Sequence, residues 1–381
     1  MDFELTNRQK QIRLAAREFA EGELKALGHE CDVKGEFPRE LIRRAASLGF
    51  TGVYIKKEYG GLGLGFLEHA IIMEEFWRID TGLGQSFGTT FGSEELLLFG
   101  SEEQKKKYLP PLVRGDWIMG FSITEPEAGS DPASGITTAE KVGDEYVING
   151  NKVMIGNGSL ANFLLVFCLT NPEAQSKSKR LSIIILETDR NGFRADKIHG
   201  KMGIRASDTA NIFFNNVRVP KENLVGMEGN GFMQLMKFFD HSRAYVAAHG
   251  VGLAQGAMEQ AVSYAKKRKQ FGQTIGSFQI TQFKIAEMAT IVETARCLTH
   301  KACANLDRGI VDTNLVAMAK WWACNVAVKV VDEALQIHGG YGFINDYDIE
   351  RFYRAAKVLE IYEGTKEIEK IVIGRNILGR A

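Results

Sequence analysis

Residues 117–123 read WIMGFSI, and the pattern of apolar residues changes at this stretch. Before it, apolar residues recur at helical spacing, as in Leu41, Ile42 and Ala45 and in AIIMEEFWRI at 70–79. After it come short aromatic or β-branched runs bounded by turn residues, namely EYVING (145–150), KVMIG (152–156), FLLVFCL (163–169), LSIIILE (181–187) and NIFFNNVRV (211–219). The dipeptide Asn149-Gly150 indicates a two-residue hairpin. We therefore predict a helical domain at 1–118 and an antiparallel β domain at 119–228.

Long helices return after Gly231. Four apolar-periodic stretches carry them, at about 232–269, 281–306, 315–340 and 367–378. Four helices of this kind predict a C-terminal four-helix bundle at 229–381. The order helical, β, helical predicts an α+β fold, because α/β proteins alternate their strands and helices along the chain.

The composition excludes several classes of protein. Lysine plus arginine equals aspartate plus glutamate, 47 each among 381 residues, so no global field attracts nucleic acid or a lipid surface. The five cysteines lie far apart, without a CxxC pair or a histidine at ligand spacing, which argues for reduced thiols and against a metal site. The sequence begins without a signal-peptide core, and its apolar runs are too short to span a bilayer. We expect a cytoplasmic protein with no membrane span and no nucleic-acid partner.

Three glycine-containing motifs each have a structural and a ligand-binding interpretation. GFSITEPEAGSD (120–131) follows a predicted strand; it is either an ordinary turn or an extended backbone that offers polar groups to a flat ring. RKQFGQTIGSFQ (268–279) closes a helix, where Arg268 stabilises the helix dipole or binds a diphosphate. QIHGGYGF (336–343) ends a helix with two glycines, which serve as a C-cap or let the backbone approach a ligand.

Two further motifs point to different chemistries. FDHSR (239–243) places Asp240 and Arg243 at i, i+3 on a helix, either as a solvated ion pair or as a grip on a polar ligand tail. GQSFG (84–88) fits the G-x-S-x-G pattern of a serine hydrolase with Ser86 as nucleophile, but that elbow needs a strand before the serine and the preceding residues are helical. No GxGxxG follows a strand and no GxxxxGK[ST] occurs, so neither a Rossmann site nor a P-loop is supported.

In their order and spacing, these motifs resemble the acyl-CoA dehydrogenase family along nearly the whole chain. The resemblance includes MGIRASDTANIFFNNVRVPKENLVG (202–226), FDHSRAYVAAHGVGLAQ (239–255) and IYEGTKEI (361–368). It implies a homotetramer that binds one FAD per subunit and desaturates an acyl-CoA thioester between its α and β carbons. It also implies an electron-transfer flavoprotein as the partner that accepts the electrons.

The resemblance implies roles for individual residues. FAD would be bound by Phe121, Ile123, Thr124, Gly129, Ser130, Met154, Ile155, Gly156, Arg268, Phe271, Gln279, Gln336, Gly339, Gly340, Thr365 and Glu367. Of these, Arg268, Phe271, Gln279, Gln336, Gly339 and Gly340 would reach the tail of a cofactor shared with a neighbouring subunit. Acyl-CoA would be bound by Ser130, Asp240, Arg243, Gly364 and Arg375, and Glu363 would be the catalytic base.

The chemistry expected of Glu363 can be stated from its neighbours. An α-proton beside a thioester is weakly acidic, so its removal needs a base in a dry pocket and a polarised carbonyl. A carboxylate beside Ile361 and Tyr362 is poorly hydrated, which raises its pKa. Gly364 removes bulk, so that a thioester can lie against the backbone. The alternative interpretation is a carboxylate that stabilises the dipole of a helix beginning near Thr365.

The chain departs from the family pattern at three places. Many relatives read Trp-Ile-Thr or Trp-Ile-Ser where this chain reads Met154-Ile155-Gly156, so the indole and the hydroxyl near the flavin are missing. Some branched-chain relatives carry their base at the position of Ser242, which cannot serve here. The segment TGLGQSFGTTFGS (81–93) contains no Arg or Lys, which argues against a dicarboxylic substrate. Its glycines, with Phe87 and Phe91, predict a compact apolar cavity for a short, branched or alicyclic acyl group.

Four other functions stay open at this point. An enoyl-CoA reductase would run the same chemistry backward, and an oxidase of the same fold would hand its electrons to oxygen. A serine hydrolase using Ser86 and a catalytically silent binding protein belong to different classes. The serine hydrolase predicts a protein without flavin absorption. The binding protein predicts that Glu363→Gln leaves the properties of the protein unchanged.

Overall fold

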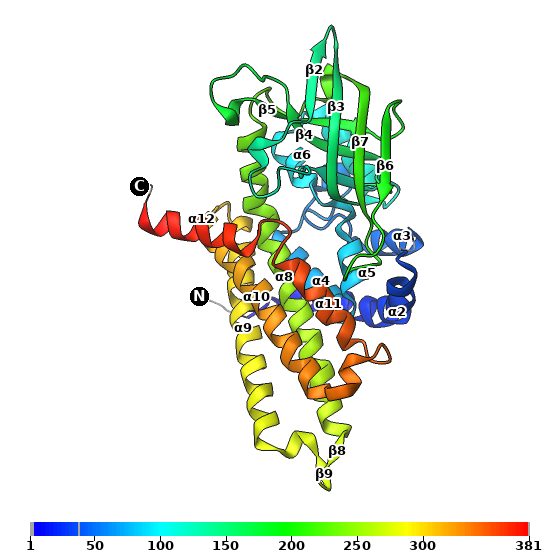
Figure 1. Cartoon of the computed structure of the whole chain (residues 1–381), viewed down its shortest axis with the longest axis vertical. Helices are drawn as coiled ribbons and strands as arrows, with labels where there is room; N and C mark the ends of the chain where they lie inside the picture. Colours follow the sequence, from blue (N-terminus) through cyan, green and yellow to red (C-terminus); the bar gives the residue numbers. More distant parts are fainter. Residues whose placement is uncertain (1–3, 37–38, 380–381) are drawn as a thin grey trace.

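The structure is a computed structural model that describes residues 4–36 and 39–379. Helices, then strands, then helices follow one another along the chain, as the sequence predicts (Figure 1). The first helices are α1 (Asn7–Phe19), α2 (Lys25–Lys34), α3 (Arg39–Ser47), α4 (Phe66–Ile79), α5 (Thr81–Ser86), α6 (Ser93–Phe99) and α7 (Glu102–Val113). Short 3-10 turns lie at Lys57–Tyr59, Gly88–Thr90, Pro132–Ser134, Lys177–Lys179, Lys221–Asn223, Ile275–Ser277 and Gly339–Phe343, and a π-helical turn at Ala20–Leu24 joins α1 to α2.

The middle of the chain folds into one seven-stranded sheet. Its strands are β1 (Met119–Ser122), β2 (Thr138–Val142), β3 (Glu145–Gly156), β4 (Phe163–Leu169), β5 (Leu181–Glu187), β6 (Phe193–Lys197) and β7 (Thr209–Pro220). The main path runs β1-β4-β2-β3-β7-β6, with β5 against β4. Four of the strand pairs are antiparallel, as predicted, but β4 pairs in parallel with β1 and, at one position, with β2, so the sheet is mixed. The long turn and the β2–β3 pair lie between β1 and β4 in the chain, which leaves room for the parallel connection.

The predicted hairpin at Asn149-Gly150 is wrong. Strand β3 runs unbroken through this dipeptide, with a register shift between Ile148 and Gly150. Asn149 accepts a hydrogen bond from the backbone N–H of Asn216 on β7 (2.8 Å), so its side chain bridges two strands instead of closing a turn. The turn lies earlier, at Gly143 (φ 62°), because β2 pairs with the first half of β3. The sequence TAEKV of β2 is mostly polar, so it lacks the run of apolar or β-branched residues that predicts a strand.

Five helices form the C-terminal part: α8 (Gly231–Lys267), α9 (Gln279–Asp307), α10 (Thr313–His338), α11 (Ile349–Leu359) and α12 (Lys366–Leu378), with the small ribbon β8 (Lys269–Gln270) and β9 (Gln273–Thr274) at the end of α8. Four were predicted, and α11 was not. Helix α8 packs closely on α4 and α10, because a Cβ at Gly252 would lie 2.4 Å from the carbonyl oxygen of Glu74 on α4 and a Cβ at Gly250 2.6 Å from that of Ala323 on α10. These contacts exclude larger residues.

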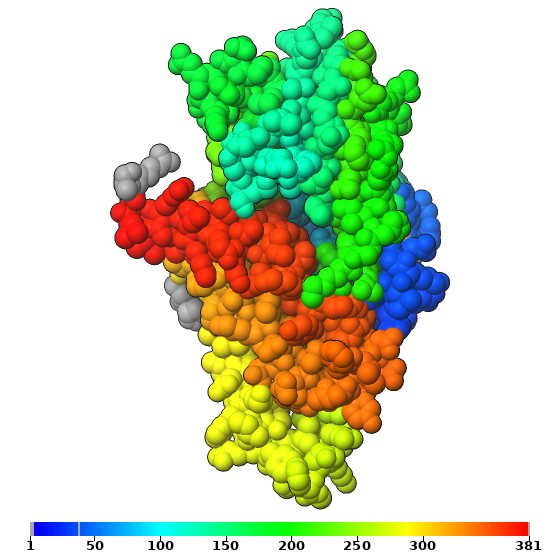
Figure 2. All heavy atoms as spheres, viewed as in Figure 1, coloured from blue at the N-terminus to red at the C-terminus, as the bar shows by residue number. Residues whose placement is uncertain are grey.

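Helix α8 runs from the strands to the far end of the molecule, where β8 and β9 form the tip (Figure 1). Helix α12 lies across the junction between the strands and the long helices (Figure 2). One apolar core joins the N-terminal helices to α8–α11, a second lies between α7, the sheet and α8, and a third lies within the sheet. No helix among the described residues is long and apolar enough to cross a membrane.

Candidate active site

The predicted base, Glu363, lies in the turn between α11 and α12. Both Glu363 (φ 56°) and Gly364 (φ 98°) adopt left-handed backbone conformations, which are costly for a residue with a side chain. The buried Lys320 of α10 donates hydrogen bonds to the carbonyls of Tyr362 and Gly364, one on each side of Glu363. The turn is therefore held in place from beneath by a cation on a rigid helix.

The carboxylate of Glu363 is half-buried and meets α8. The hydroxyl of Ser242 donates a 2.7 Å hydrogen bond to Glu363 Oε2, and Arg243 Nε donates to the Glu363 carbonyl at 2.8 Å. Burial raises the pKa of Glu363, as its apolar neighbours predict, while the Ser242 hydrogen bond and the charges of Arg243 and Lys320 oppose that rise. The interpretation of Glu363 as a helix-capping carboxylate is not supported, because Thr365 caps α12 by accepting from Ile368 N.

Arg243 is buried, whereas one of the two interpretations of FDHSR predicted a solvated ion pair with Asp240. Its Nε lies 3.1 Å from Oε1 of the fully buried Glu369 on α12, and its guanidinium stacks 4.5 Å from the centre of the Phe239 ring. Asp240 is half-buried nearby, and burial raises its pKa. A Cβ on Gly364 would lie 2.4 Å from Glu369 Oε1. Gly364 is thus required both by its φ and by this contact, and Glu369 is a partner that the sequence analysis missed.

The predicted flavin-contacting strand packs against α8, the helix that also contacts Glu363. Phe121 packs edge-on against Phe238 of α8, with ring centres 5.0 Å apart. Lys152 Nζ donates to the carbonyl of Ile123 (2.8 Å) and to Glu125 Oε1 (2.9 Å). Both charged groups are buried, and burial lowers the pKa of Lys152. Spacing alone could not show that the backbone of this strand is fixed by a buried ion pair.

Residues 153–156 of β3 show how this part of the sheet differs from the usual Trp-Ile-Thr or Trp-Ile-Ser pattern of the family. Val153 N donates to the carbonyl of Thr124 (2.9 Å), so the second predicted flavin contact is also tied to β3. Met154 has φ 59° and an exposed fraction of 66%, next to a register shift of β3. Ile155 is buried, whereas a Cβ on Gly156 would meet nothing within 4 Å. Met154 therefore projects from the sheet without cover from the described residues.

Other predicted residues of this group are more peripheral. Gly129 and Ser130 are exposed in the turn after β1. Thr365 is the N-cap of α12, and Glu367 and Arg375 are exposed along that helix. The structure describes their positions in one chain and brings none of them into a hydrogen bond with Glu363.

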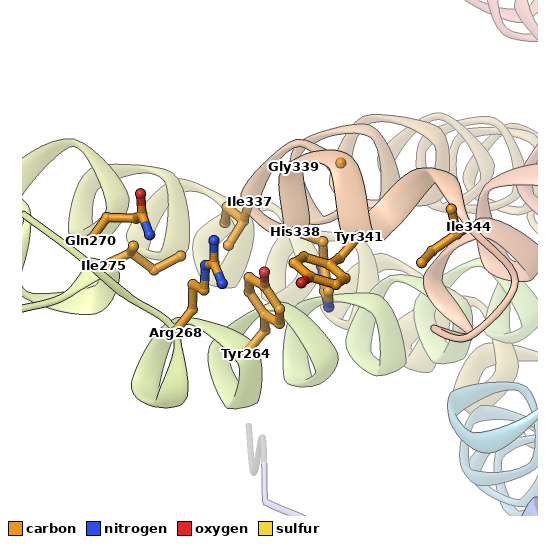
Figure 3. A pocket seen from close by; sticks show the side chains of 10 residues that line it. Tyr264, Arg268, Gln270, Ile275, Ile337, His338, Gly339, Tyr341 and Ile344 are labelled. Atoms are coloured by element: carbon orange, nitrogen blue, oxygen red, sulfur yellow. The ribbon is translucent and has the colours of Figure 1, made fainter.

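The remaining predicted cofactor residues gather at the opposite end of α8. A cavity of about 500 Å³ is lined there by Arg268, Gly339 and Gly340, together with Tyr264, Gln270, Ile275, Ile337, His338, Tyr341 and Ile344 (Figure 3). The Arg268 guanidinium lies 5.4 Å from the centre of the Tyr341 ring. Phe271 is 94% exposed, and Gln279 and Gln336 are exposed on α9 and α10.

The two groups of predicted cofactor residues are far apart within one chain. Arg268 follows Ser242 by 26 positions along α8, which corresponds to about 40 Å of helix. Ser86, by contrast, is the buried last residue of α5 and donates to the Gly82 carbonyl at 2.9 Å. Because helix α4 precedes it and no strand does, the hydrolase elbow is wrong.

Three family models match consecutive parts of the chain: the N-terminal domain of acyl-CoA dehydrogenase at residues 6–116, the middle domain at 120–217 and the C-terminal domain at 229–378. The chain belongs to the acyl-CoA dehydrogenase family. Members of this family are FAD-dependent oxidoreductases.

Similar proteins match this chain from end to end. The short-chain specific acyl-CoA dehydrogenase of Clostridium acetobutylicum is 41% identical over 379 residues, covering 99% of this chain and 100% of that protein. The 3-(aryl)acrylate reductase of Clostridium sporogenes is 40% identical over 375 residues, covering 98% and 99%. A chain from the structure of the electron transferring flavoprotein of Acidaminococcus fermentans has a TM-score of 0.97 at 41% identity, with 100% of each chain covered.

The residues of the distal cavity suit the tail of FAD. Arg268 offers a guanidinium of the kind that binds a diphosphate bidentately, and Tyr341, Tyr264 and His338 offer aromatic faces. A Cβ on Gly339 or Gly340 would meet nothing within 4 Å, so their backbone is open to close approach. At the other end, the tied carbonyls of Ile123 and Thr124 form a rigid edge. The Arg268 guanidinium, the aromatic faces and the open glycine backbone therefore fit the FAD that members of this family bind.

One more group near Glu363 was missed by the sequence analysis. Glu94 and Glu95, directly after the segment 81–93, are both buried, and burial raises their pKa values to about 7 and about 8. Phe87, which was expected to line the acyl cavity, instead packs in the core against Phe76, with ring centres 4.7 Å apart. Two consecutive acids at the start of a helix normally indicate a solvated helix N-terminus, so no sequence signal marked them as buried.

Proposed function

We propose that this protein is an acyl-CoA dehydrogenase that introduces an α,β double bond into a short, branched or alicyclic acyl-CoA thioester, with Glu363 as the base. The observation that carries the proposal is the Glu363 carboxylate, half-buried, with a raised pKa and hydrogen-bonded to Ser242 at the junction of sheet and helices. A carboxylate of raised pKa is suited to take a weakly acidic proton.

The residues around Glu363 have separate roles in the proposed reaction. Glu363 takes the α-proton onto its carboxylate, and the backbone amide at the Glu363-Gly364 turn polarises the thioester carbonyl. Bound FAD supplies the acceptor for the hydride that leaves the β carbon. Arg243 and Asp240 hold the CoA portion, with Ser130 and Arg375 further along it. The same groups also serve the reverse reaction.

Reduction of an enoyl-CoA is therefore the second candidate. It is favoured by the likeness to a relative named as a 3-(aryl)acrylate reductase, whereas the likeness to a short-chain specific acyl-CoA dehydrogenase favours oxidation. The exposed Met154, in place of the usual indole, also leaves an oxidase within reach. The direction depends on the redox potentials of the flavin and its partner.

Partners follow from the same comparisons. The likeness to a chain from the electron transferring flavoprotein structure supports an electron-transfer flavoprotein as the acceptor. The separation of about 40 Å along α8 between Ser242 and Arg268 supports an oligomer, because one FAD cannot reach both groups in a single chain. We propose a homotetramer in which the Arg268 cavity receives the tail of a neighbour's FAD, and a cytoplasmic location.

The decisive experiment compares Glu363→Gln with Glu363→Asp. Anaerobic mixing with butyryl-CoA should bleach the flavin bands of the wild type, and Glu363→Gln should slow bleaching by about 10²–10⁴-fold, the usual worth of a general base. Glu363→Asp, which keeps a carboxylate, should retain part of the rate. Full-speed bleaching in Glu363→Gln would show that another group is the base, and absence of flavin bands would remove the whole proposal.

A further inference from the structure

His249 is a buried histidine of α8 that the proposed reaction does not use. Its exposed fraction is 6%, and its ring stacks on the indole of Trp77 of α4, with ring centres 4.7 Å apart and 12° between the two planes. Burial, followed by the charge of His69, lowers the pKa of His249 to about 3. The imidazole is therefore neutral near pH 7, and the stack fixes the plane in which its nitrogens form hydrogen bonds.

The hydrogen-bond partner of His249 is Tyr362, the residue directly before the proposed base. The Tyr362 hydroxyl oxygen lies 2.8 Å from His249 Nδ1, and the hydroxyl donates a longer hydrogen bond of 3.4 Å to Gln85 Oε1. Because a hydroxyl has one proton, the imidazole donates through Nδ1–H when the hydroxyl donates to Gln85. The far end of the Tyr362 side chain is thus held by two residues that are distant from it in the sequence.

The backbone of the same tyrosine is also held. Lys320 Nζ donates a 2.7 Å hydrogen bond to the Tyr362 carbonyl, so the residue is fixed both at its peptide group and at its hydroxyl. The next residue, Glu363, has a φ of 56°. A residue with a side chain keeps such a conformation only where its surroundings impose it. Tyr362 is the neighbour through which those surroundings act on the backbone of Glu363.

Helix α8 meets two consecutive residues of this turn with two of its side chains. Ser242 bonds the Glu363 carboxylate, and His249 bonds the Tyr362 hydroxyl. The two are seven positions apart, or about two helical turns, so they project from the same face of α8. The close contacts of Gly250 with α10 and of Gly252 with α4 leave this part of the helix no room to shift. The turn is therefore docked at two points on a rigid support.

Gln85 connects the same hydroxyl to the segment 81–93, which the sequence analysis placed near the acyl group. A Cβ on Gly84 would lie 3.0 Å from Trp77 Cδ1, so α5 packs against the indole on which His249 stacks. The stack, the Tyr362 hydroxyl and α5 form one packed unit beside the base. Loss of the bond between His249 and Tyr362 would loosen this unit at its centre.

We infer that His249 is a positioning residue for the catalytic base, which holds the turn that carries Glu363 through the Tyr362 hydroxyl and so keeps the carboxylate in one orientation. The inference rests on the proposed function, because it takes Glu363 as the base. It assigns to His249 an effect on the rate of proton removal and none on the affinity for the acyl-CoA.

The test removes the bond from the Tyr362 end. The holoenzyme is mixed anaerobically with butyryl-CoA in a stopped-flow instrument, and the dependence of flavin bleaching on butyryl-CoA concentration gives a rate constant at saturation and a Kd. Tyr362→Phe removes only the hydroxyl. We expect the rate constant to fall by about 10–10²-fold, because misplacement of a catalytic group by about 1 Å costs about 10²-fold. The Kd should stay close to that of the wild type.

Variants of His249 assign the effect to the bond. His249→Leu has no hydrogen-bonding nitrogen and should slow flavin reduction as much as Tyr362→Phe does, whereas His249→Asn, which has an amide near the position of Nδ1, should recover part of the rate. The double variant His249→Leu/Tyr362→Phe should be no slower than either single variant, because both remove the same bond. Tyr59→Phe is the control, since Tyr59 is also buried and donates to Glu102 at 2.8 Å; it should keep the wild-type rate.

The outcomes separate this inference from the proposed function. Wild-type rates in Tyr362→Phe, with Glu363→Gln still slow, overturn the role of His249 and leave Glu363 as the base. A rate loss that comes with a weaker Kd also overturns it, because Tyr362 would then contact the substrate. A double variant whose loss is the product of the two single losses shows that the residues act separately. If His249→Leu does not retain FAD, Tyr362→Phe and His249→Asn decide. Full-speed bleaching in Glu363→Gln overturns the inference together with the proposed function.

Discussion

Ser242 Oγ donates a 2.7 Å hydrogen bond to Glu363 Oε2, across a gap of 121 residues in the sequence. The bond stabilises the ionised form of the carboxylate and so opposes the rise in its pKa that burial causes. The serine that cannot act as a base therefore adjusts the pH range in which Glu363 can.

The first prediction concerns this bond. Ser242→Ala should raise the pKa of Glu363 further, because the ionised carboxylate loses a donor. A base must be deprotonated to act, so flavin reduction speeds up as pH rises through this pKa, and the variant's profile should shift upward by about one pH unit, as a hydrogen bond to a charged group is worth about 1.5 kcal/mol. Stopped-flow rates from pH 5 to 9 measure it. Ser242→Thr keeps a hydroxyl and should stay near the wild-type profile; an unshifted Ala profile would contradict the role of the bond.

The second prediction concerns the cation beneath the turn. Lys320→Met removes the donors to the carbonyls of Tyr362 and Gly364, so the left-handed turn at Glu363 should lose its fixed geometry. We expect flavin reduction to fall by about 10²-fold, as misplacement of a catalytic group by about 1 Å does, while FAD stays bound. Lys329→Met, at an exposed position of the same helix, is the control. Equal rates in the two variants would show that the turn holds itself.

The third prediction concerns the buried pair of Lys152 and Glu125. Lys152→Met leaves Glu125 charged and buried without its partner, which should lower the free energy of unfolding by about 3–5 kcal/mol. The Ile123 carbonyl is released too, so the ratio of flavin to protein absorbance after gel filtration should fall. The double variant Lys152→Met/Glu125→Gln should recover part of the stability. No recovery would mean that the pair does not act as a unit, and denaturant unfolding measures each variant.

The fourth prediction concerns Glu95. Burial, followed by the charge of Glu94, raises its pKa to about 8, whereas an unfolded glutamate titrates near 4.3. The folded state therefore binds an extra proton between these values, and stability falls as pH rises through that window. Glu95→Gln removes the effect, so at pH 8 it should be more stable, relative to wild type, than at pH 5, by about 3–4 kcal/mol. A constant difference in unfolding free energy at both pH values would show that Glu95 is ionised in the fold.

Strong local patterns predicted most elements of this fold. The runs FLLVFCL and LSIIILE became the buried strands β4 and β5, and the four long apolar-periodic stretches became α8, α9, α10 and α12. Asn149-Gly150 failed because tertiary pairing with β7 outweighed a local turn preference. The polar strand β2 was missed because its order comes from its neighbours.

Part of the candidate site could likewise be predicted from the sequence, and part could not. The position of Glu363 could be predicted from its motif, and the direction of its pKa shift from its apolar neighbours. The contacts of Ser242 and Lys320 with the Glu363 turn, and the bond of Lys152 to the Ile123 carbonyl, could not be predicted, because each joins residues far apart in sequence and depends on which face of a helix or strand turns inward. Glu94 was missed because an acid at a helix start is ordinary in sequence, and only its burial sets it apart.

Helix α8 also constrains how this protein can change. It carries Ser242 near one end and leads into Arg268 at the other, with closely packed glycines between them. One residue inserted between those points would rotate everything beyond it by about 100°, turning either the serine or the arginine away from its site and driving side chains into the backbones of α4 and α10. The length of this segment is therefore less free to vary than the identity of almost any residue on its surface, and insertions should be tolerated in the loops around it long before they are tolerated within it.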